Sequence, residues 1–270
     1  IYIGLLSGRK QIPYYANVQG LGTAFQKPVL TGLVTILYRK AFQKVKYVFF
    51  ENKENASEFC KRKIISADRQ IVLAGAGINL ERYKMQPYPK HTRIHFLYLG
   101  RIMKEKGIDE LFYAVRHLKK ENFVLDLVGF FEDEYKEQVK ELEKHSIAHF
   151  YGFQSDPRPF YIEADCVVLP SYHEGMSNVI LEAAATGRPV ITSNIPGCRE
   201  SVENGKSGLL VEVKNKEMLY DAMKEMLHCS REEREQMGQA GREKMEREFR
   251  KEVVVEKTVQ SLREDEKRDF

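Results

Sequence analysis

The sequence predicts an α/β protein built on a doubly wound parallel sheet. Two observations support this class: short apolar runs recur between about residue 94 and residue 211, and segments of helical periodicity separate them. The chain has 270 residues, of which 43% are hydrophobic and 30% charged, enough for one large domain or two smaller ones with proper cores.

The expected elements follow in chain order. Before a change of pattern near residues 87–95, strands are predicted at 13–17 and 47–50, with a helix at 29–44 between them. After it, strands are predicted at 94–99, 124–128, 149–151, 166–169, 189–192 and 208–211, with helices between them. From Lys216 onward the chain is charged, with apolar residues at helical spacing. These patterns divide the chain into residues 1–86, residues 87–250 and a charged helical tail at 251–270.

Composition excludes several classes of protein. The net charge is only +4, there is no block of Lys and Arg, and there is no tryptophan, so nucleic acid is a poor partner. The four cysteines form no CxxC pair, which argues against a zinc site or a disulfide framework and favours a reducing cytoplasm. No apolar run reaches the roughly 18 residues of a membrane-spanning helix.

A polar turn between a strand and a helix is the most informative stretch. The strand pattern that ends at Leu169 is followed by a turn that contains Glu174, and then by an apolar helix that contains Glu182. Ser177 or Asn178 can cap that helix, yet neither has a Glu or Gln three residues later, so no capping box uses the first amides. Those N–H groups can therefore meet an anion.

Two cations follow another predicted strand. Arg101 comes directly after Gly100, and Lys106 precedes Gly107. Because open α/β sheets bind ligands at the carboxyl ends of their strands, both cations and the turn before Val179 could share one crevice and bind a diphosphate. The alternative is that Arg101 and Lys106 are solvated loop charges. In the same alternative, Glu174 caps or solvates a loop and Glu182 lies on an ordinary helix face.

Taken together, these motifs resemble a known family. The pairs Gly100-Arg101 and Lys106-Gly107, two glutamates separated by seven residues, the run at 187–191 and the run at 205–211 are similar to retaining glycosyltransferases of family 4, which have the GT-B fold. The resemblance covers about residues 14–249 and is closest to members that build bacterial surface polysaccharides. It implies a donor-binding Rossmann-like domain preceded by an incomplete N-terminal one, with about a hundred residues of that domain absent.

The resemblance also implies roles for single residues. Arg101 and Lys106 would bind the donor diphosphate, Glu182 the ribose hydroxyls, and Glu174 the transferred sugar, while the base would pack near residues 151–154. The implied reaction transfers a hexosyl or N-acetylhexosaminyl group from a nucleotide-sugar, with UDP as the expected nucleotide, to an acceptor hydroxyl, and needs neither a metal nor a cofactor. The catalytic set is Arg101, Lys106 and Glu174, and the donor-binding set is Gly100, Gly175, Met176, Ser177, Asn178, Val179 and Glu182.

Two alternatives remain for the whole chain: a nucleotide-sugar binding module without turnover, and a GT-B sugar-nucleotide epimerase. The latter normally needs extra acids and a histidine in the cleft. A dinucleotide motif at Gly20 and Gly22 lacks its third glycine, where Phe25 stands, so these glycines are assigned to a cleft loop. His145 and His149 could share a metal, but no third ligand is near in the sequence.

The segment at 27–46 is a basic amphipathic helix pattern. Such helices can lie on anionic membranes, whereas the alternative is a core helix of the N-terminal domain with solvated ends. With a carbohydrate or polyprenyl-linked acceptor, the first interpretation would place the protein at the inner face of the cell membrane.

Overall fold

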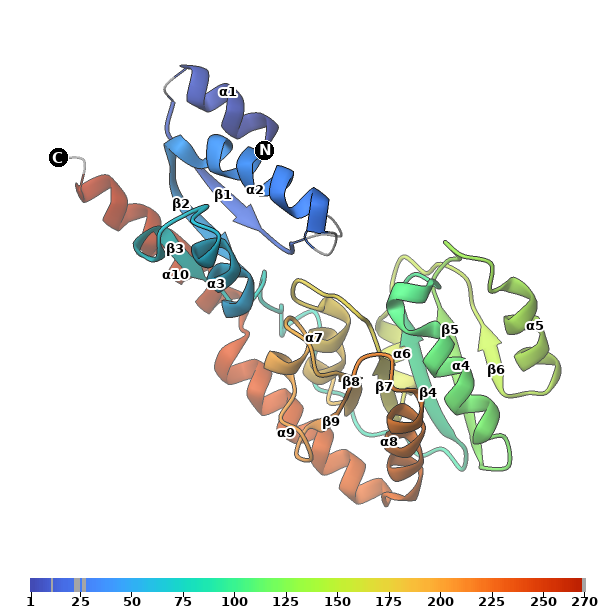
Figure 1. Ribbon diagram of the computed structural model, residues 1–270. Coiled ribbons are helices and arrows are strands. Elements are labelled where there is room, and N and C mark those ends of the chain that lie inside the picture. The colour runs from blue at the N-terminus through green and yellow to red at the C-terminus, as the bar shows by residue number, and fades with distance from the viewer. Residues whose placement is uncertain (11, 22–24, 26–27, 269–270) are drawn as a thin grey trace. The chain divides into compact units, whose positions relative to one another are not determined.

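The computed structural model describes the chain except residues 11, 22–24, 26–27 and 269–270, and it divides into two compact units (Figure 1). The first unit combines residues 1–77 with residues 252–270, and the second comprises residues 78–251.

The first unit contains a parallel sheet. Among its described residues, β1 (Tyr14–Val18), β2 (Val45–Phe50) and β3 (Gln70–Val72) pair in that order. Its core is aromatic: the rings of Phe25, Tyr38, Phe42 and Phe50 surround Phe59 at centroid distances of 5.1–6.1 Å. The helices of this unit are α1 (Tyr2–Lys10), α2 (Pro28–Ala41), α3 (Lys53–Lys61) and α10 (Lys251–Arg268).

The second unit, which is described throughout, has a six-stranded parallel sheet in the order β6-β5-β4-β7-β8-β9. The strand order reverses between β4 and β7, which makes that point the topological switch, where α/β sheets bind ligands. The strands are β4 (Ile94–Leu99), β5 (Phe123–Val128), β6 (Ala148–Phe150), β7 (Cys166–Leu169), β8 (Val190–Ser193) and β9 (Gly208–Val211).

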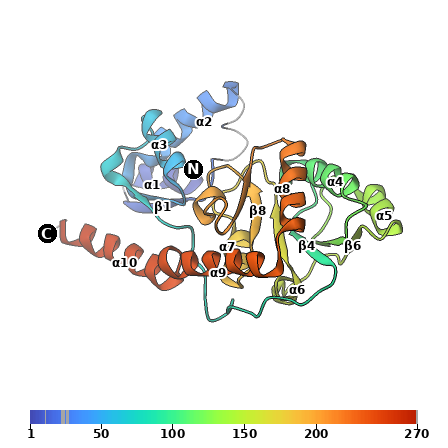
Figure 2. The ribbon, with the colours of Figure 1, turned by 90° about the horizontal axis from the view of Figure 1, so that it is seen from below.

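Helices cover both faces of this sheet (Figure 2). Helix α4 packs with α8 on one face, and α7 packs with α9 on the other. This two-sided cover explains why β5 and β7 are buried at every position. The helices are α4 (Ile108–His117), α5 (Lys136–Lys144), α6 (Arg158–Glu163), α7 (Asn178–Ala185), α8 (Lys216–His228) and α9 (Arg231–Glu248), with short 3-10 turns η4 (Lys104–Lys106) and η5 (Arg199–Ser201).

The strand predictions for the second unit are confirmed, and those at 94–99, 166–169 and 208–211 agree with the observed bounds. The predicted helix at 29–44 forms as α2 followed by a 3-10 turn at Phe42–Lys44. The short strand β3 and helix α1 were not expected, because β3 has only three residues and α1 lacks a clear apolar stripe.

The unit boundaries differ from the divisions expected after residues 86 and 250. Residues 78–86 belong to the second unit, because the Ile78 amide donates to Phe249 O (2.7 Å) and the Gln86 amide to Thr186 O (3.2 Å). Most of the expected tail, residues 252–270, belongs to the first unit, where Lys257 Nζ donates to Val72 O at 2.8 Å. Hydrogen bonds between residues distant in the chain set both boundaries, and sequence patterning does not reveal them.

Candidate functional site

The start of α7 lies at the switch point and is open. Ser177 is its N-cap, one of the two candidates that the sequence offered, and its side chain makes no capping hydrogen bond. The Ser177 amide donates instead to Gly197 O at 2.9 Å, which fixes the turn against the loop after β8. The positive end of the α7 dipole therefore faces the loop that contains Glu174.

Lys106 and Glu174 meet in this loop region. Lys106 Nζ lies 2.6 Å from Glu174 Oε1, and the two side chains are only 17% and 15% exposed. Lys106 comes from the loop after β4 and Glu174 from the loop after β7, the two strands at the switch point. The structure thus brings a cation, a carboxylate and a helix N-terminus to one place.

Two glycines allow these loops to approach each other. Gly107 has φ +73°, and a Cβ there would lie 2.1 Å from Pro170 O. Gly197 has φ +85°, and a Cβ there would lie 2.0 Å from Gly175 O. Any other residue would be strained and would push the loops apart, so backbone packing and not side chains alone sets the geometry of the site.

Arg101 pairs with a different carboxylate. Its guanidinium forms an ion pair with Glu132 at 2.9 Å, and the side chain is 48% exposed. Glu132 follows β5, which lies on the opposite side of β4 from β7. The Arg101 backbone is fixed, because its carbonyl accepts a hydrogen bond from Tyr98 Oη at 2.5 Å. The structure therefore brings Lys106 and Glu174 together and leaves the Arg101 side chain beside Glu132.

Glu182 lies one turn inside α7, in contact with aromatic hydroxyls. Tyr161 Oη of α6 donates to Glu182 Oε2 at 2.9 Å. Burial raises the pKa of Glu182, and the hydrogen bonds from Tyr83 and Tyr161 act in the opposite direction. Sequence reasoning missed both tyrosines, because the sequence does not distinguish a tyrosine that contacts a carboxylate from one that only packs in the core.

The other predicted residues take varied positions. Gly100 donates its amide to Val128 O at 2.9 Å; Gly175, Met176 and Val179 are partly buried, and Asn178 is exposed. Gly20 is exposed after β1 in the first unit, and Gly22 lies outside the described residues.

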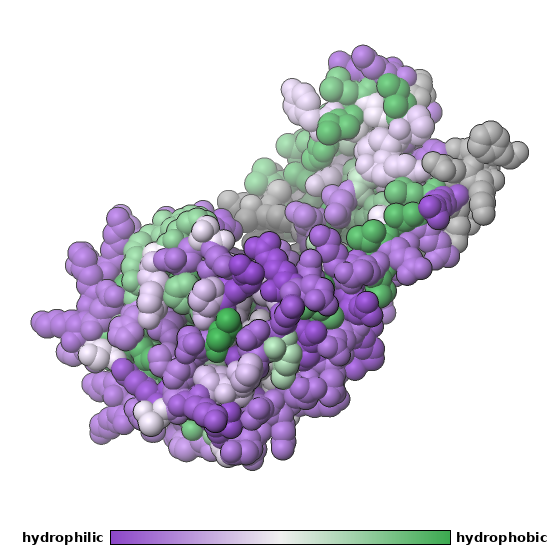
Figure 3. Space-filling view, turned by 180° about the vertical axis from the view of Figure 1, so that it is seen from behind, coloured by the Kyte–Doolittle hydropathy of each residue, from purple (hydrophilic) through white to green (hydrophobic). Residues whose placement is uncertain are grey.

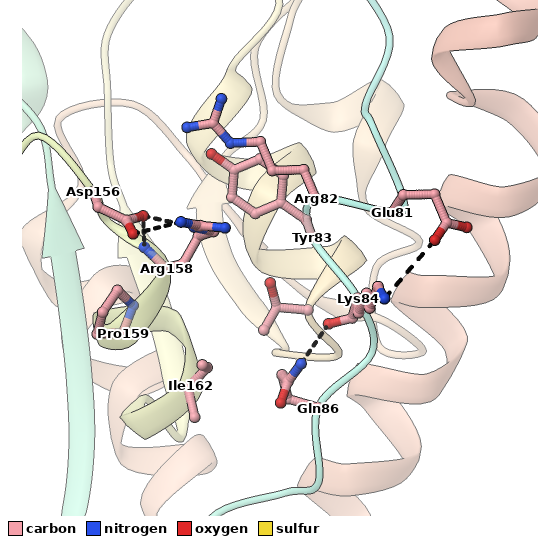
Figure 4. Close-up of a pocket in the computed structure, with 10 residues that line it drawn as sticks. Glu81, Arg82, Tyr83, Lys84, Gln86, Asp156, Arg158, Pro159 and Ile162 are labelled. Carbon is pink, nitrogen blue, oxygen red and sulfur yellow. Dashed lines mark hydrogen bonds and ion pairs between the residues drawn. The ribbon is translucent and has the colours of Figure 1, made fainter.

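A cavity of about 470 Å³ is lined in part by Tyr83, which packs near Glu182 (Figure 4). Residues 81–86 form one wall, and the start of α6 forms the other, where Arg158 pairs with Asp156 at 2.7 Å. No sequence motif predicted this cavity. It is lined by Glu81, Arg82, Tyr83, Lys84, Gln86, Asp156, Arg158, Pro159, Ile162 and Thr186.

The described residues contain neither a metal-ligand cluster nor a membrane-spanning helix. No group of three or more His, Cys, Asp or Glu side chains there could hold a metal ion. Within the same residues, every helix is too short or too polar to cross a membrane.

Comparison with known proteins extends these observations. The family described as Glycosyl transferases group 1 matches residues 80–244, more than half of the chain. A curated relative from Campylobacter jejuni, N,N'-diacetylbacillosaminyl-diphospho-undecaprenol alpha-1,3-N-acetylgalactosaminyltransferase, is 30% identical over 232 residues, which cover 78% of this chain and 61% of the relative. The capsular polysaccharide biosynthesis glycosyltransferase CapM of Staphylococcus aureus is 27% identical, over 89% of this chain and 72% of CapM. The chain thus spans about 61% of the length of the first of these relatives.

Solved structures share the fold. Anabaena Alr3699/HepE in complex with UDP has a TM-score of 0.80 at 18% identity, over 97% of this chain and 75% of that one. Sucrose-phosphate synthase from Thermosynechococcus elongatus has a TM-score of 0.78 at 22% identity, over 96% and 71% of the two chains. These structures are GT-B glycosyltransferases, in agreement with the parallel sheets seen here. The chain belongs to the glycosyl transferases group 1 family.

Proposed function

We propose that this chain holds the donor site of a retaining glycosyltransferase, which transfers a sugar from a nucleoside diphosphate to an acceptor hydroxyl. The observation that carries the proposal is the meeting of Lys106 and Glu174 beside the open start of α7. A cation and a helix N-terminus at one carboxyl edge supply two sources of positive potential, which suit the two phosphates of such a donor.

The chemistry needs charge stabilisation more than proton transfer from the protein. As the bond from the sugar C1 to the phosphate oxygen breaks, negative charge develops on the departing diphosphate. The Lys106 ammonium and the α7 amides would stabilise that charge without reorganising. The bond from the acceptor oxygen to C1 then forms on the same face, and the departing phosphate oxygen accepts the acceptor's proton. Hence we assign no general base and propose a mechanism without a metal.

Arg101 would join this site by exchanging partners. Its ion pair with Glu132 is half exposed, and exposed pairs contribute only about 0–1 kcal/mol, so a diphosphate can compete for the guanidinium. Glu174 would hold the hydroxyls of the transferred sugar, and Glu182 would accept hydrogen bonds from the ribose.

UDP is the proposed nucleotide, and a hexose or N-acetylhexosamine the proposed sugar. The first is supported by the UDP complex of a fold neighbour, and the second by the name of the Campylobacter relative. The test is a calorimetric titration of the protein with UDP, GDP, ADP and pyrophosphate. We expect UDP to bind most tightly and pyrophosphate to bind detectably. If no nucleoside diphosphate binds, the proposal is refuted, while binding of UDP without sugar transfer or donor hydrolysis would favour the nucleotide-sugar binding module.

A requirement for metal is tested separately in the full-length protein. Transfer should continue in the presence of a chelator, because cations of the protein carry the neutralising charge. Loss of transfer on chelation, with recovery when Mg²⁺ or Mn²⁺ is added, would show that the metal-free mechanism is wrong.

A lipid-linked acceptor at the cytoplasmic face of the membrane is part of the proposal. The sequence has no Asp or Glu before Glu51, but it has seven Lys and Arg there: Arg9, Lys10, Lys27, Arg39, Lys40, Lys44 and Lys46. Exposed apolar side chains accompany this charge on α1 and α2, including Tyr2, Ile3, Leu33 and Ile36 at 57–83% exposure. Figure 3 shows hydrophobic side chains gathered on the first unit, which contains α1 and α2, whereas the visible face of the second unit is mainly hydrophilic.

Vesicle flotation tests this membrane contact. The protein should bind vesicles that contain phosphatidylglycerol and should be released by salt, because apolar insertion and attraction to anionic lipid act together. Ile36→Glu should reduce binding. Val253→Glu on α10, where the valine is 46% exposed, is the matched control. Equal losses in the two variants, or no binding to anionic vesicles, would contradict the proposal.

A further inference from the structure

Two tyrosines, Tyr161 and Tyr83, lie beside the carboxylate of Glu182. Tyr161 is fully buried in α6, and its Oη donates to Glu182 Oε2 at 2.9 Å. Tyr83, which is 7% exposed, approaches the same carboxylate; burial and then the hydrogen bond to Glu182 raise the pKa of Tyr83 to about 12. The two rings meet edge to face, with centroids 6.3 Å apart. Both hydroxyls therefore stay protonated at neutral pH, and the Tyr161 hydroxyl donates to Glu182.

Two arginines, one partly and one fully buried, fix the backbone of both tyrosines. Arg242 Nη1 donates to Tyr83 O and to Ala185 O, each at 2.9 Å, so one guanidinium joins Tyr83 to the end of the helix that contains Glu182. Arg188 Nε donates to Tyr161 O at 2.8 Å, and the Arg188 side chain is fully buried. The phenols are consequently placed by the packed interior and not by a mobile surface loop.

We propose that Tyr161, and Tyr83 packed against it, are positioning residues, which orient the Glu182 carboxylate so that its remaining lone pairs accept the two ribose hydroxyls. A carboxylate offers about four acceptor positions, and two phenol donors leave enough for a vicinal diol. Without these donors, the desolvated carboxylate would take up a proton more readily and lose acceptor capacity. The inference depends on the ribose contact of Glu182 in the proposed function.

The hydrogen-bond geometry distinguishes this role from simple core packing. Other tyrosine hydroxyls pair one to one, as Tyr88 does with Asp165 O and Tyr135 with the Asp109 carboxylate. Tyr83 and Tyr161 come instead from separate segments and converge on one ionisable side chain. Tyr83 also lines the cavity in Figure 4, so the two tyrosines adjoin open space that a ligand can enter.

The test uses Tyr83→Phe, Tyr161→Phe and Glu182→Gln, singly and combined, with UDP and pyrophosphate as calorimetric ligands. Each Tyr→Phe change should weaken UDP roughly threefold to thirtyfold and leave pyrophosphate affinity unchanged, because only UDP carries a ribose. In the Glu182→Gln background, a Tyr→Phe change should have little further effect, since coupled residues are not additive. Tyr135→Phe, which loses a phenol bond to Asp109 at 2.8 Å, is the matched control.

A pH series adds a readout that packing alone would not move. Because the phenol hydrogen bonds lower the pKa of Glu182 while burial raises it, the acid-side loss of UDP binding should move to higher pH in the Tyr→Phe variants. If Tyr161→Phe fails to fold, Tyr83→Phe carries the same comparison.

Three results would overturn the inference: unchanged UDP affinity in both phenylalanine variants, equal losses for UDP and pyrophosphate, or full additivity with Glu182→Gln. If Glu182→Gln itself leaves UDP affinity unchanged, the ribose contact is absent and the inference fails with it. The diphosphate role of Lys106 would be untouched by that result, because pyrophosphate binding measures it separately.

Discussion

Replacement of Lys106 by Met removes one charge and keeps most of the side-chain volume. The ammonium and its partner Glu174 are 17% and 15% exposed and 2.6 Å apart, so the pair lies between the surface limit of about 0–1 kcal/mol and the 3–5 kcal/mol lost when a buried pair is broken. We expect the free energy of unfolding to fall by about 2 kcal/mol. Loss of a charge-assisted phosphate contact should weaken the binding of UDP by about 1.5–3 kcal/mol, which raises its dissociation constant roughly tenfold to a hundredfold.

Denaturant unfolding and calorimetry with UDP separate these two effects. In the Lys106→Met/Glu174→Gln double variant, stability should recover because no unpaired charge remains, while UDP affinity should stay low. Lys104→Met changes an exposed lysine in the same 3-10 turn and is the matched control. The reasoning is refuted if Lys106→Met binds UDP as tightly as the parent protein, or if Lys104→Met loses as much affinity.

Two further predictions concern Arg101 and His95. Arg101→Gln should weaken UDP severalfold without changing the melting temperature, because its pair with Glu132 is half exposed; a large stability loss in thermal unfolding would contradict this. The hydrogen bond that the His95 ring donates to Asp126 raises the pKa of His95, so this pair should stabilise the fold fully below about pH 6.5 and progressively less as the pH rises through the raised pKa. In His95→Gln this part of the pH dependence should be absent, and identical melting profiles of the two proteins would count against the pair.

Local pattern carried much of the prediction in the second unit. Residues 166–169 and 208–211 are continuous apolar runs bounded by turn residues. Such runs are typical of parallel strands that are covered on both faces of the sheet. The absence of a capping box at α7 was also predictable, since no Glu or Gln stands three positions after Ser177, whereas the unbonded Ser177 side chain was not predictable. The resemblance to glycosyltransferases rested on the order of several short motifs, which the family match confirms.

The unit boundaries and the partners of the charged residues were not predictable in this way. Residues 78–86 join the second unit through hydrogen bonds to residues far along the chain, such as the one from Ile78 to Phe249. Similarly, Arg101 and Lys106 are five positions apart in one loop, yet they form ion pairs with different carboxylates, Glu132 and Glu174. Rotation about several side-chain bonds decides such partners, and sequence spacing leaves it undetermined.

By itself the sequence determined the parallel α/β class, the strands of the second sheet and the residues that stand at their carboxyl ends, because periodicity and turn chemistry act over short distances. Tertiary structure alone decided that Lys106 meets Glu174, that Arg101 turns to Glu132, and that two tyrosines converge on Glu182. Those contacts depend on strand order and on close backbone approach at Gly107 and Gly197, which join segments that local sequence patterns treat as independent.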